Sequence, residues 1–220
     1  MTAFRSAAVL GLLLASACSD SRAHARATCV LVDVSGTYDD QRPEVARILR
    51  TGLLPKVRPG DTLLIVRIDD DSYGKENVEA KVTFDSQPSR ANAQKLALAA
   101  TLEKFGAARK RTRFTDISGA LLLAAEYLRE THAGQKTILI FSDMKEELPP
   151  GARRKLAEKE LEGIDVVAMN VKRLGPDKLD PAAYRKRLAT WEARVTASGA
   201  SSWTVVLDPE ELVKQLSGEI

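Results

Sequence analysis

Three short segments of the chain carry oxygen-bearing side chains of the kind that bind a hard metal ion. Asp33, Ser35 and Thr37 stand at alternate positions directly after an apolar run, so in an extended turn their oxygens point the same way. Thr115 adds a hydroxyl at the start of a helical stretch, and Asp143 adds a carboxylate just after another apolar run. Mg2+ prefers oxygen ligands and keeps several waters, which suits a site with few carboxylates. With only two acidic groups, the bound ion would stay electrophilic and accept one more carboxylate from a partner protein.

The elements that must position these residues are predicted from hydrophobic patterning. Short continuous apolar runs rich in branched residues are typical of strands buried on both faces of a parallel sheet. The runs lie at 30–32, 63–66, 137–141, 166–169 and 203–207. Between them, apolar residues recur at helical spacing in 45–53, 117–128 and 184–195, and Asp208 with Pro209 marks the start of a last helix.

Two departures from simple alternation refine the predicted topology. After the polar turn 69–77, residues 78–84 alternate apolar with polar and predict an antiparallel edge strand. Two helices, 91–105 and 116–131, then follow with no strand between them. We therefore expect an α/β fold with a doubly wound, mostly parallel sheet, one antiparallel edge strand and helices on both faces. In such sheets, ligands bind beside the carboxyl ends of the strands.

The ordered motifs resemble the metal-ion-dependent adhesion site of the von Willebrand factor type A domain. That family's pattern is D-x-S-x-S, a distant Thr and an Asp after the next strand, and it corresponds here to DVSGT at 33–37, Thr115 in FTDISGAL and Asp143 in ILIFSD. The resemblance covers about residues 29–216 and implies a Rossmann-like fold and a non-enzymatic protein-binding role. The family's pattern differs here at Thr37, where Ser is commoner, and at Met144, where Gly often follows the Asp.

The resemblance also implies a role for each residue of the predicted site. Asp33, Ser35 and Thr37 would contact Mg2+, or Mn2+ or Ca2+, directly or through water. Thr115 would join them in some states, and Asp143 would act through a water molecule. The partner would be an envelope protein that supplies an acidic residue.

The same residues also fit other interpretations. The fold could be a structural envelope protein whose metal site is unused. DVSGT also resembles the D-x-D-x-T loop of haloacid-dehalogenase-type phosphatases, with Asp33 as nucleophile, but Ser35 is too weak an acid to protonate a leaving group. Asp69 to Asp71 lack the acidic spacing of an EF-hand and are expected to form a solvated turn.

A basic segment, formed by Arg109, Lys110, Arg111 and Arg113, precedes Thr115. It is either a positive rim that draws acidic partners or lipid head groups to the metal face or a solvated interhelical loop.

Composition excludes several classes of function. The chain has 220 residues, 33 Lys and Arg against 30 Asp and Glu, and 44% hydrophobic residues, which indicates one folded domain. Two cysteines and two histidines are too few for a disulfide framework or a Cys/His zinc cage. The net charge of +3 gives no reason to expect a nucleic-acid partner.

The first residues are typical of a bacterial export signal. Residues 1–17 carry Arg5 and an apolar stretch, and small residues precede Cys18, as in signals of lipoproteins. We expect Cys18 to be lipidated, residues 18–28 to form a tether and 29–220 to form the domain, with Ser19 favouring the outer membrane. The alternative is cleavage after Ala25, which would leave a soluble periplasmic protein.

Overall fold

The computed structural model describes residues 24–36, 38–108, 112–169, 180–208, 210–212 and 214. Residues 1–23, with Cys18, lie outside the described residues, so the export signal, the lipid anchor and the alternative cleavage after Ala25 stay predictions. Within the described part of the chain, no helix combines the length and the apolar character needed to cross a membrane.

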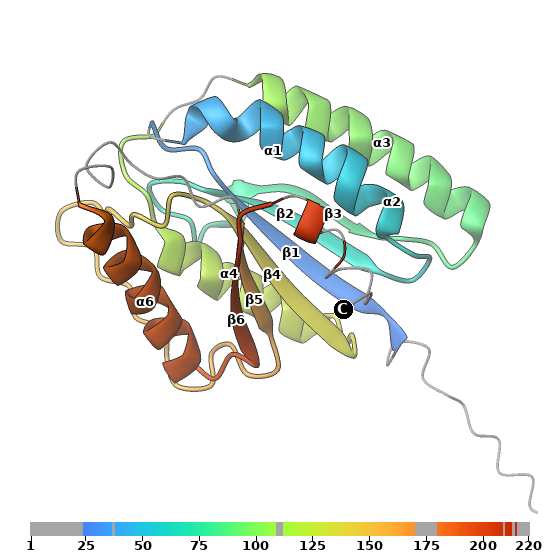
Figure 1. Cartoon of the computed structure of the whole chain (residues 1–220). Coiled ribbons are helices and arrows are strands. Elements are labelled where there is room, and N and C mark those ends of the chain that lie inside the picture. The colour runs from blue at the N-terminus through green and yellow to red at the C-terminus, as the bar shows by residue number, and fades with distance from the viewer. Residues whose placement is uncertain are drawn as a thin grey trace, which may run out of the picture.

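A six-stranded sheet forms the centre of the molecule (Figure 1). Its strand order is β3-β2-β1-β4-β5-β6, and every neighbouring pair is parallel except the β2–β3 pair. The strands are β1 Arg26–Asp33, β2 Thr62–Ile68, β3 Val78–Thr83, β4 Gln135–Phe141, β5 Asp165–Met169 and β6 Ser202–Val206. The predicted mostly parallel sheet with one antiparallel edge strand is confirmed.

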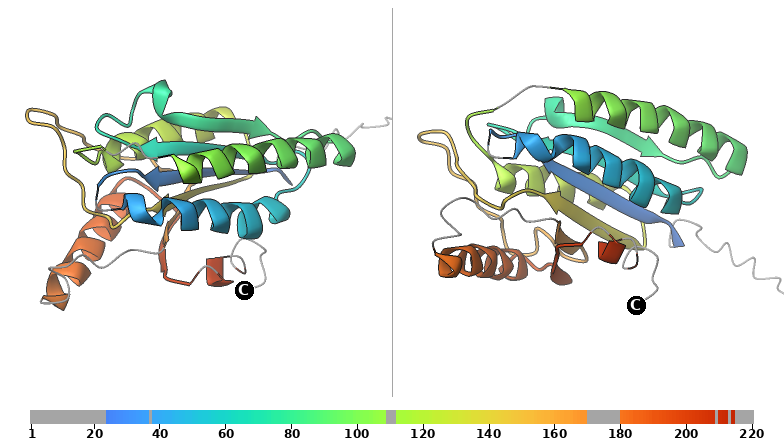
Figure 2. Two further views of the ribbon diagram at one scale, coloured as in Figure 1. Left: turned by 90° about the horizontal axis from the view of Figure 1, so that it is seen from above. Right: turned by 45° about the horizontal axis from the view of Figure 1, so that its top comes forward.

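Helices cover both faces of this sheet, as Figures 1 and 2 show. One face carries α1, α2 and α3, and the other carries α4 and α6. The helices are α1 Arg42–Ile48, α2 Leu54–Lys56, α3 Pro88–Ala107, α4 Ile117–Glu130 and α6 Pro181–Ala197, with the π-helical turn η3 Leu49–Leu53 and the 3-10 turns η2 Asp39–Gln41 and η4 Lys75–Asn77. The π-helical turn lies beside Pro55, whose ring nitrogen cannot donate the usual helical hydrogen bond.

The strands are apolar throughout because each face of the sheet is packed against helices. In β1, Cys29 and Leu31 pack in the core beneath α4, whereas Val30 and Val32 pack in the core beneath α1 and α3. All four side chains are fully buried. The continuous apolar run therefore reflects two cores rather than one, as expected for the inner strands of a doubly wound sheet.

The folded region begins earlier than the boundary at residue 29 that we predicted. The backbone N–H of Arg26 donates to Asp61 Oδ1 at 2.9 Å, and its guanidinium donates to Asp61 Oδ2 at 2.7 Å. This pairing fixes the start of β1 at Arg26, inside the stretch that was expected to be a tether. Hydropathy missed the strand start because its anchor is an ion pair and not an apolar side chain.

Candidate functional site

The ends of two neighbouring parallel strands bring the predicted carboxylates to one edge of the sheet. Asp33 is the last residue of β1, and Asp143 follows β4 by two residues. β1 and β4 are paired in parallel register, with Val32 opposite Phe141. The two carboxyl groups thus leave the sheet at the same end, where ligands of doubly wound folds bind.

Asp33 has a buried carboxylate that accepts two hydrogen bonds from loop residues at the same end of the sheet. Its Oδ1 accepts the Ser35 N–H at 2.8 Å, and its Oδ2 accepts the Ser142 hydroxyl at 2.7 Å. The pKa of Asp33 is raised to about 6: burial is the main cause, the hydrogen bonds from Ser35 and Ser142 oppose the rise, and the charge of Asp143 adds a smaller increase. Ser142 was not predicted as a site residue, although in the sequence this hydroxyl-bearing residue stands directly between the apolar run of β4 and Asp143.

Asp143 has one carboxylate oxygen to which the described structure offers no partner. Its Oδ1 accepts the backbone N–H of Lys145 at 2.8 Å. Its Oδ2 is buried and has no hydrogen-bond partner among the described residues. A buried, unsatisfied charged oxygen is costly unless a cation or a water meets it. This oxygen is therefore the feature of the site that most clearly fits a bound metal ion or its water.

Met144 holds the loop after Asp143 in a left-handed conformation. Its φ is +62°, in the left-handed region that glycine adopts more readily than a residue with a side chain. The Met144 N–H donates to Ser142 Oγ at 2.9 Å, and its carbonyl accepts the Trp191 indole N–H at 2.8 Å. The Met144 side chain is fully buried in the core under α4 and α6. The loop thus keeps a glycine-like backbone while a large side chain anchors it.

Thr115 is held between two loops by its backbone and by its neighbours. Its N–H donates to the Glu147 carbonyl at 2.7 Å, and its carbonyl accepts the Glu147 N–H at 3.0 Å. On its other side, the Asp116 N–H donates to the Asp69 carbonyl at 2.9 Å, and the Phe114 N–H donates to Asp70 Oδ1 at 2.7 Å. The turn expected to be merely solvated is therefore a support for Thr115: Asp69 is buried, and of these three acidic residues only Asp71 is exposed.

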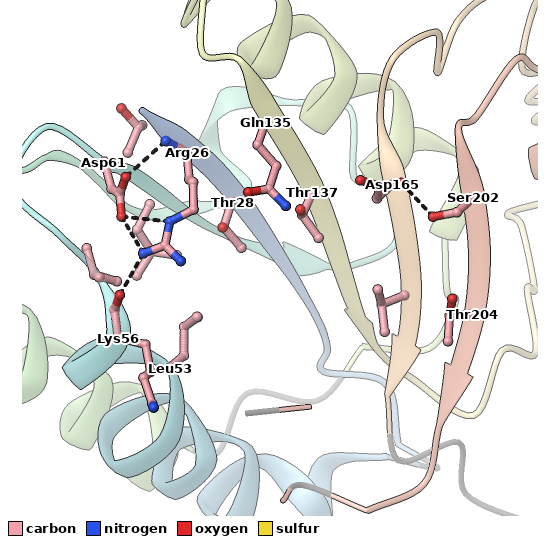
Figure 3. Close-up of a pocket in the computed structure, with 14 residues that line it drawn as sticks. Arg26, Thr28, Leu53, Lys56, Asp61, Gln135, Thr137, Asp165, Ser202 and Thr204 are labelled. Carbon is pink, nitrogen blue, oxygen red and sulfur yellow. Dashed lines mark hydrogen bonds and ion pairs between the residues drawn. The ribbon is translucent and has the colours of Figure 1, made fainter. Parts of the chain in front are cut away.

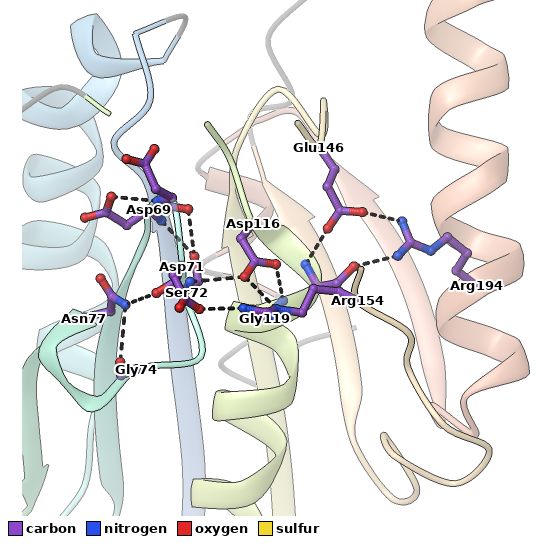
Figure 4. A network of polar contacts seen from close by, with 12 residues as sticks. Asp69, Asp71, Ser72, Gly74, Asn77, Asp116, Gly119, Glu146, Arg154 and Arg194 are labelled. Atoms are coloured by element: carbon purple, nitrogen blue, oxygen red, sulfur yellow. Dashed lines mark hydrogen bonds and ion pairs between the residues drawn. The ribbon is translucent and has the colours of Figure 1, made fainter. Parts of the chain in front are cut away.

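A polar network fixes the first turn of α4 just beyond Thr115 (Figure 4). Asp116 caps the helix through a 2.7 Å bond from the Gly119 N–H to Oδ1, and its Oδ2 accepts from Arg154 Nε at 3.0 Å and from the Ser72 N–H at 3.2 Å. Arg154 also pairs with Asp71 at 2.5 Å.

Glu146 belongs to the same network and joins the loop after Asp143 to two helices. Its Oε1 accepts the Ser118 N–H at 2.7 Å, and its Oε2 accepts from Arg194 of α6 at 3.0 Å. Sequence patterning did not identify Glu146, Arg154 or Arg194, because their partners lie far away along the chain.

A small hollow opens beside the predicted metal residues. Its volume is about 140 Å3, and it is lined by Ser35, Gly36, Thr112, Arg113, Thr115, Lys145 and Glu147. Of the basic rim, Arg113 lines the hollow, whereas Arg109, Lys110 and Arg111 lie outside the described residues, as does Thr37. Lys145 and Glu147 were not predicted and form an ion pair with each other.

The side chains that meet at this edge of the sheet differ from those of a metal centre built from several acidic, His or Cys ligands. In the described ranges, no group of three or more His, Cys, Asp or Glu side chains could hold a metal ion. The residues that meet at this edge are instead two carboxylates, Asp33 and Asp143, with the hydroxyl-bearing Ser35 and Thr115. This donor set fits a hydrated Mg2+ and does not fit a zinc cage.

Another hollow, of about 220 Å3, lies at the opposite end of the sheet (Figure 3). Arg26, Thr28, Asp61, Gln135 and Thr137 are among the residues that line it. Its Arg26 and Asp61 form the ion pair that starts β1. The hollow is thus distinct from the edge where Asp33 and Asp143 meet.

No protein-family model and no curated protein matches the sequence. Several solved structures are similar in fold. An aerotolerance-related membrane protein from Bacteroides fragilis aligns with a TM-score of 0.51 and 13% identity, over 88% of this chain and 99% of that one. The PilB minor pilin from Streptococcus sanguinis aligns with a TM-score of 0.52 and 12% identity, over 89% of this chain and 60% of that one.

The pilus adhesin SpaC from Lactobacillus rhamnosus GG also aligns, with a TM-score of 0.52 and 12% identity, over 89% of this chain and 30% of that one. At these identities the likenesses show the fold alone. The fold is the Rossmann-like α/β fold of the von Willebrand factor type A domain, with its antiparallel edge strand and two successive helices before β4.

Proposed function

We propose that this chain is a non-enzymatic protein-binding module of the bacterial envelope. It would use a divalent metal ion, Mg2+ or else Mn2+ or Ca2+, to coordinate an acidic residue of a protein partner. Asp33, Ser35 and Thr37 would hold the ion, with Thr115 and Asp143 beside them. The bound ion would supply a positive charge that is not fully neutralised by the chain.

The observation that carries the proposal is the buried Oδ2 of Asp143. It lies on the loop next to Asp33, and no described residue donates a hydrogen bond to it. Two neighbouring buried carboxylates, one with an oxygen that no described residue meets, are a poor arrangement for stability alone, because an unpaired charge is costly to bury. A cation at this edge, held directly or through water, would offset that cost.

The charge count explains why a partner carboxylate would be accepted. Only Asp33 would contact the divalent ion with a carboxylate, because Asp143 would act through water and the other expected ligands, Ser35, Thr37 and Thr115, are neutral hydroxyls. Mg2+ requires about six oxygens, so several coordination positions would be filled by water. A partner Asp or Glu would exchange for one of these waters and gain a charge-assisted contact at an open hollow.

An envelope location is supported by the predicted export signal and by the kind of proteins that share the fold. A membrane protein, a minor pilin and a pilus adhesin are among them. Attachment to the outer membrane would come from acyl chains on Cys18, since several chains bind a membrane far more firmly than one. Cleavage after Ala25 would give a soluble periplasmic form instead.

A thermal-unfolding experiment tests the metal. A ligand that binds only the folded state stabilises it by about 2.7 kcal/mol when its concentration is a hundredfold above its Kd. We expect Mg2+ or Mn2+ to raise the Tm of the wild type in chelator-treated buffer and to leave Asp33→Ala unchanged. Asp165→Ala, at the opposite end of the sheet, is the matched control and should respond like the wild type. A wild type whose Tm does not respond to millimolar metal would refute the metal site and leave the fold intact.

A separate experiment tests the partner. Immobilised protein should retain an envelope protein from bacterial extract in Mg2+ and release it when chelator is added. Asp33→Ala should retain none of it. Retention that is equal in metal and in chelator would argue for a partner that does not use the metal.

A further inference from the structure

The hollow beside the predicted metal residues contains a carboxylate of the chain itself. Glu147 lines the hollow together with Ser35 and Thr115. Its position is fixed, because its backbone N–H and carbonyl both pair with Thr115, at 3.0 and 2.7 Å. The side chain is about half exposed, so it lines the hollow where solvent can reach it and is not part of the core.

Lys145 is the cation that pairs with Glu147, and the backbone N–H of Lys145 is hydrogen-bonded to Asp143. The Lys145 ammonium forms an ion pair with Glu147 Oε1, while the Lys145 N–H donates to Asp143 Oδ1 at 2.8 Å. The ion pair therefore spans the gap between the two residues, Asp143 and Thr115, that approach the site from different elements. Both side chains of the pair are about 50% exposed, so water and a partner can reach them.

Glu147 does not join Asp33 and Asp143 as a third acidic ligand. Across the described parts of the chain, no three His, Cys, Asp or Glu side chains come close enough to hold a metal ion together. The Glu147 carboxylate thus lies beside the site, among the residues that line the hollow, without belonging to the donor set. A partner carboxylate that approaches the metal would meet the negative charge of Glu147 and the positive charge of Lys145.

We infer that Glu147 is a built-in competitor of the incoming carboxylate and that Lys145 is the cation they share. In the free protein, Lys145 pairs with Glu147, and both side chains line the hollow. When the partner binds, Lys145 would exchange Glu147 for the partner's carboxylate, and the Glu147 side chain would rotate toward the solvent. The inference rests on the proposed function, because it assigns the regulation of the same site.

The proposal predicts opposite effects of one substitution on two probes. Glu147→Gln removes a negative charge near the metal, so it should weaken binding of Mn2+ alone. The same change removes the competitor and frees Lys145, so it should strengthen binding of a carboxylate. A half-exposed ion pair is worth up to about 1 kcal/mol, which corresponds to a change of about fivefold. A residue with a merely structural role would move both affinities in the same direction.

The experiment is an NMR titration of the isotope-labelled protein in millimolar Mg2+. The probe is a capped pentapeptide with one central Glu between glycines, and its Gln analogue reports binding that does not need the carboxylate. Glu147→Gln should bind the Glu peptide about fivefold more tightly than the wild type, and Lys145→Met about fivefold more weakly. Glu130→Gln is the matched control, because its half-exposed pair with Lys81 lies at the far end of α4 from Thr115.

The outcomes separate this inference from the proposed function. If Mn2+ binds the wild type but Glu147→Gln binds the Glu peptide no more tightly, the competitor role is wrong and the metal site stands. If Mn2+ does not bind the wild type, both fail. If Glu147→Gln gains affinity for the Glu peptide but not for its Gln analogue, while its affinity for Mn2+ falls, the inference is supported.

Discussion

The two aspartates that cap α4 and α6 provide a direct test of how the site is held. Asp116 and Asp180 both accept helical N–H groups, but only Asp116 is buried and has partners outside its helix. Asp116→Ala would remove the bond from Gly119, leave the N–H of the fully buried Ser72 without its acceptor and release Arg154. Asp180→Ala would remove only two bonds at an exposed helix start.

The magnitudes differ enough to be measured. Loss of a helix cap costs about 1 kcal/mol, and a buried donor left without a partner costs about 1–3 kcal/mol more. Arg154 keeps its contact with Asp71, so its release adds little. We therefore expect Asp116→Ala to lower the free energy of unfolding by about 3 kcal/mol and Asp180→Ala by about 1 kcal/mol. Asp116→Asn, which keeps an acceptor for Gly119, should fall between them.

Equilibrium unfolding in urea is the appropriate assay, with the denaturant slope compared across variants to verify two-state behaviour. Chelator in the buffer removes any contribution from metal. Equal losses for Asp116→Ala and Asp180→Ala would refute the reasoning, because they would mean that the bonds to Ser72 and Arg154 contribute nothing to stability.

Three further predictions follow from single residues. Because burial raises the pKa of Asp33 to about 6, protons should compete with the metal for this carboxylate near that pH. The rise in Tm that Mg2+ causes should therefore become smaller as the pH falls through 6. An equal rise at every pH would contradict this prediction. Met144→Gly relieves a left-handed φ that costs about 1 kcal/mol, but it removes a buried side chain that contributes about 2–5 kcal/mol. Urea unfolding should therefore show a free energy of unfolding lower by about 2 kcal/mol. A higher free energy of unfolding would show that the backbone strain dominates. Burial raises the pKa of the Cys29 thiol far above its usual range, so maleimide should not modify Cys29 in the native protein and should modify it in urea. Mass spectrometry of the Cys29 peptide measures this, and rapid labelling of the native protein would show that β1 opens.

The sequence was sufficient to predict the sheet because its information is local. Each buried strand is a short apolar run, and the alternation in 78–84 distinguished the antiparallel edge strand β3 from the others. The placement of Asp33 and Asp143 at one edge also followed, since parallel strands end together. The start of β1 could not be predicted, because it depends on the pairing of Arg26 with Asp61, which is 35 residues away.

The supports of the site were beyond prediction for the same reason. Glu146 reaches Arg194 across 48 residues, and Asp116 reaches Ser72 across 44. Asp69 and Asp70 looked like an ordinary polar turn, yet they hold the backbone on either side of Thr115. Hydroxyl and acidic residues in loops have too many candidate partners for spacing to choose among them. The metal, the partner and the lipid anchor stay predictions.

The position of β1 has a mechanical consequence. β1 lies between β2 and β4, is parallel to both and is in register with them along its length. Whatever precedes Arg26 is joined at one end of this strand, and Asp33 stands at the other. A pull between an anchor on the N-terminal side and a partner bound at Asp33 would therefore run along the strand axis. Such a load shears the hydrogen bonds on both sides of β1 together instead of peeling them one by one, so the fold is suited to transmit tension without unravelling.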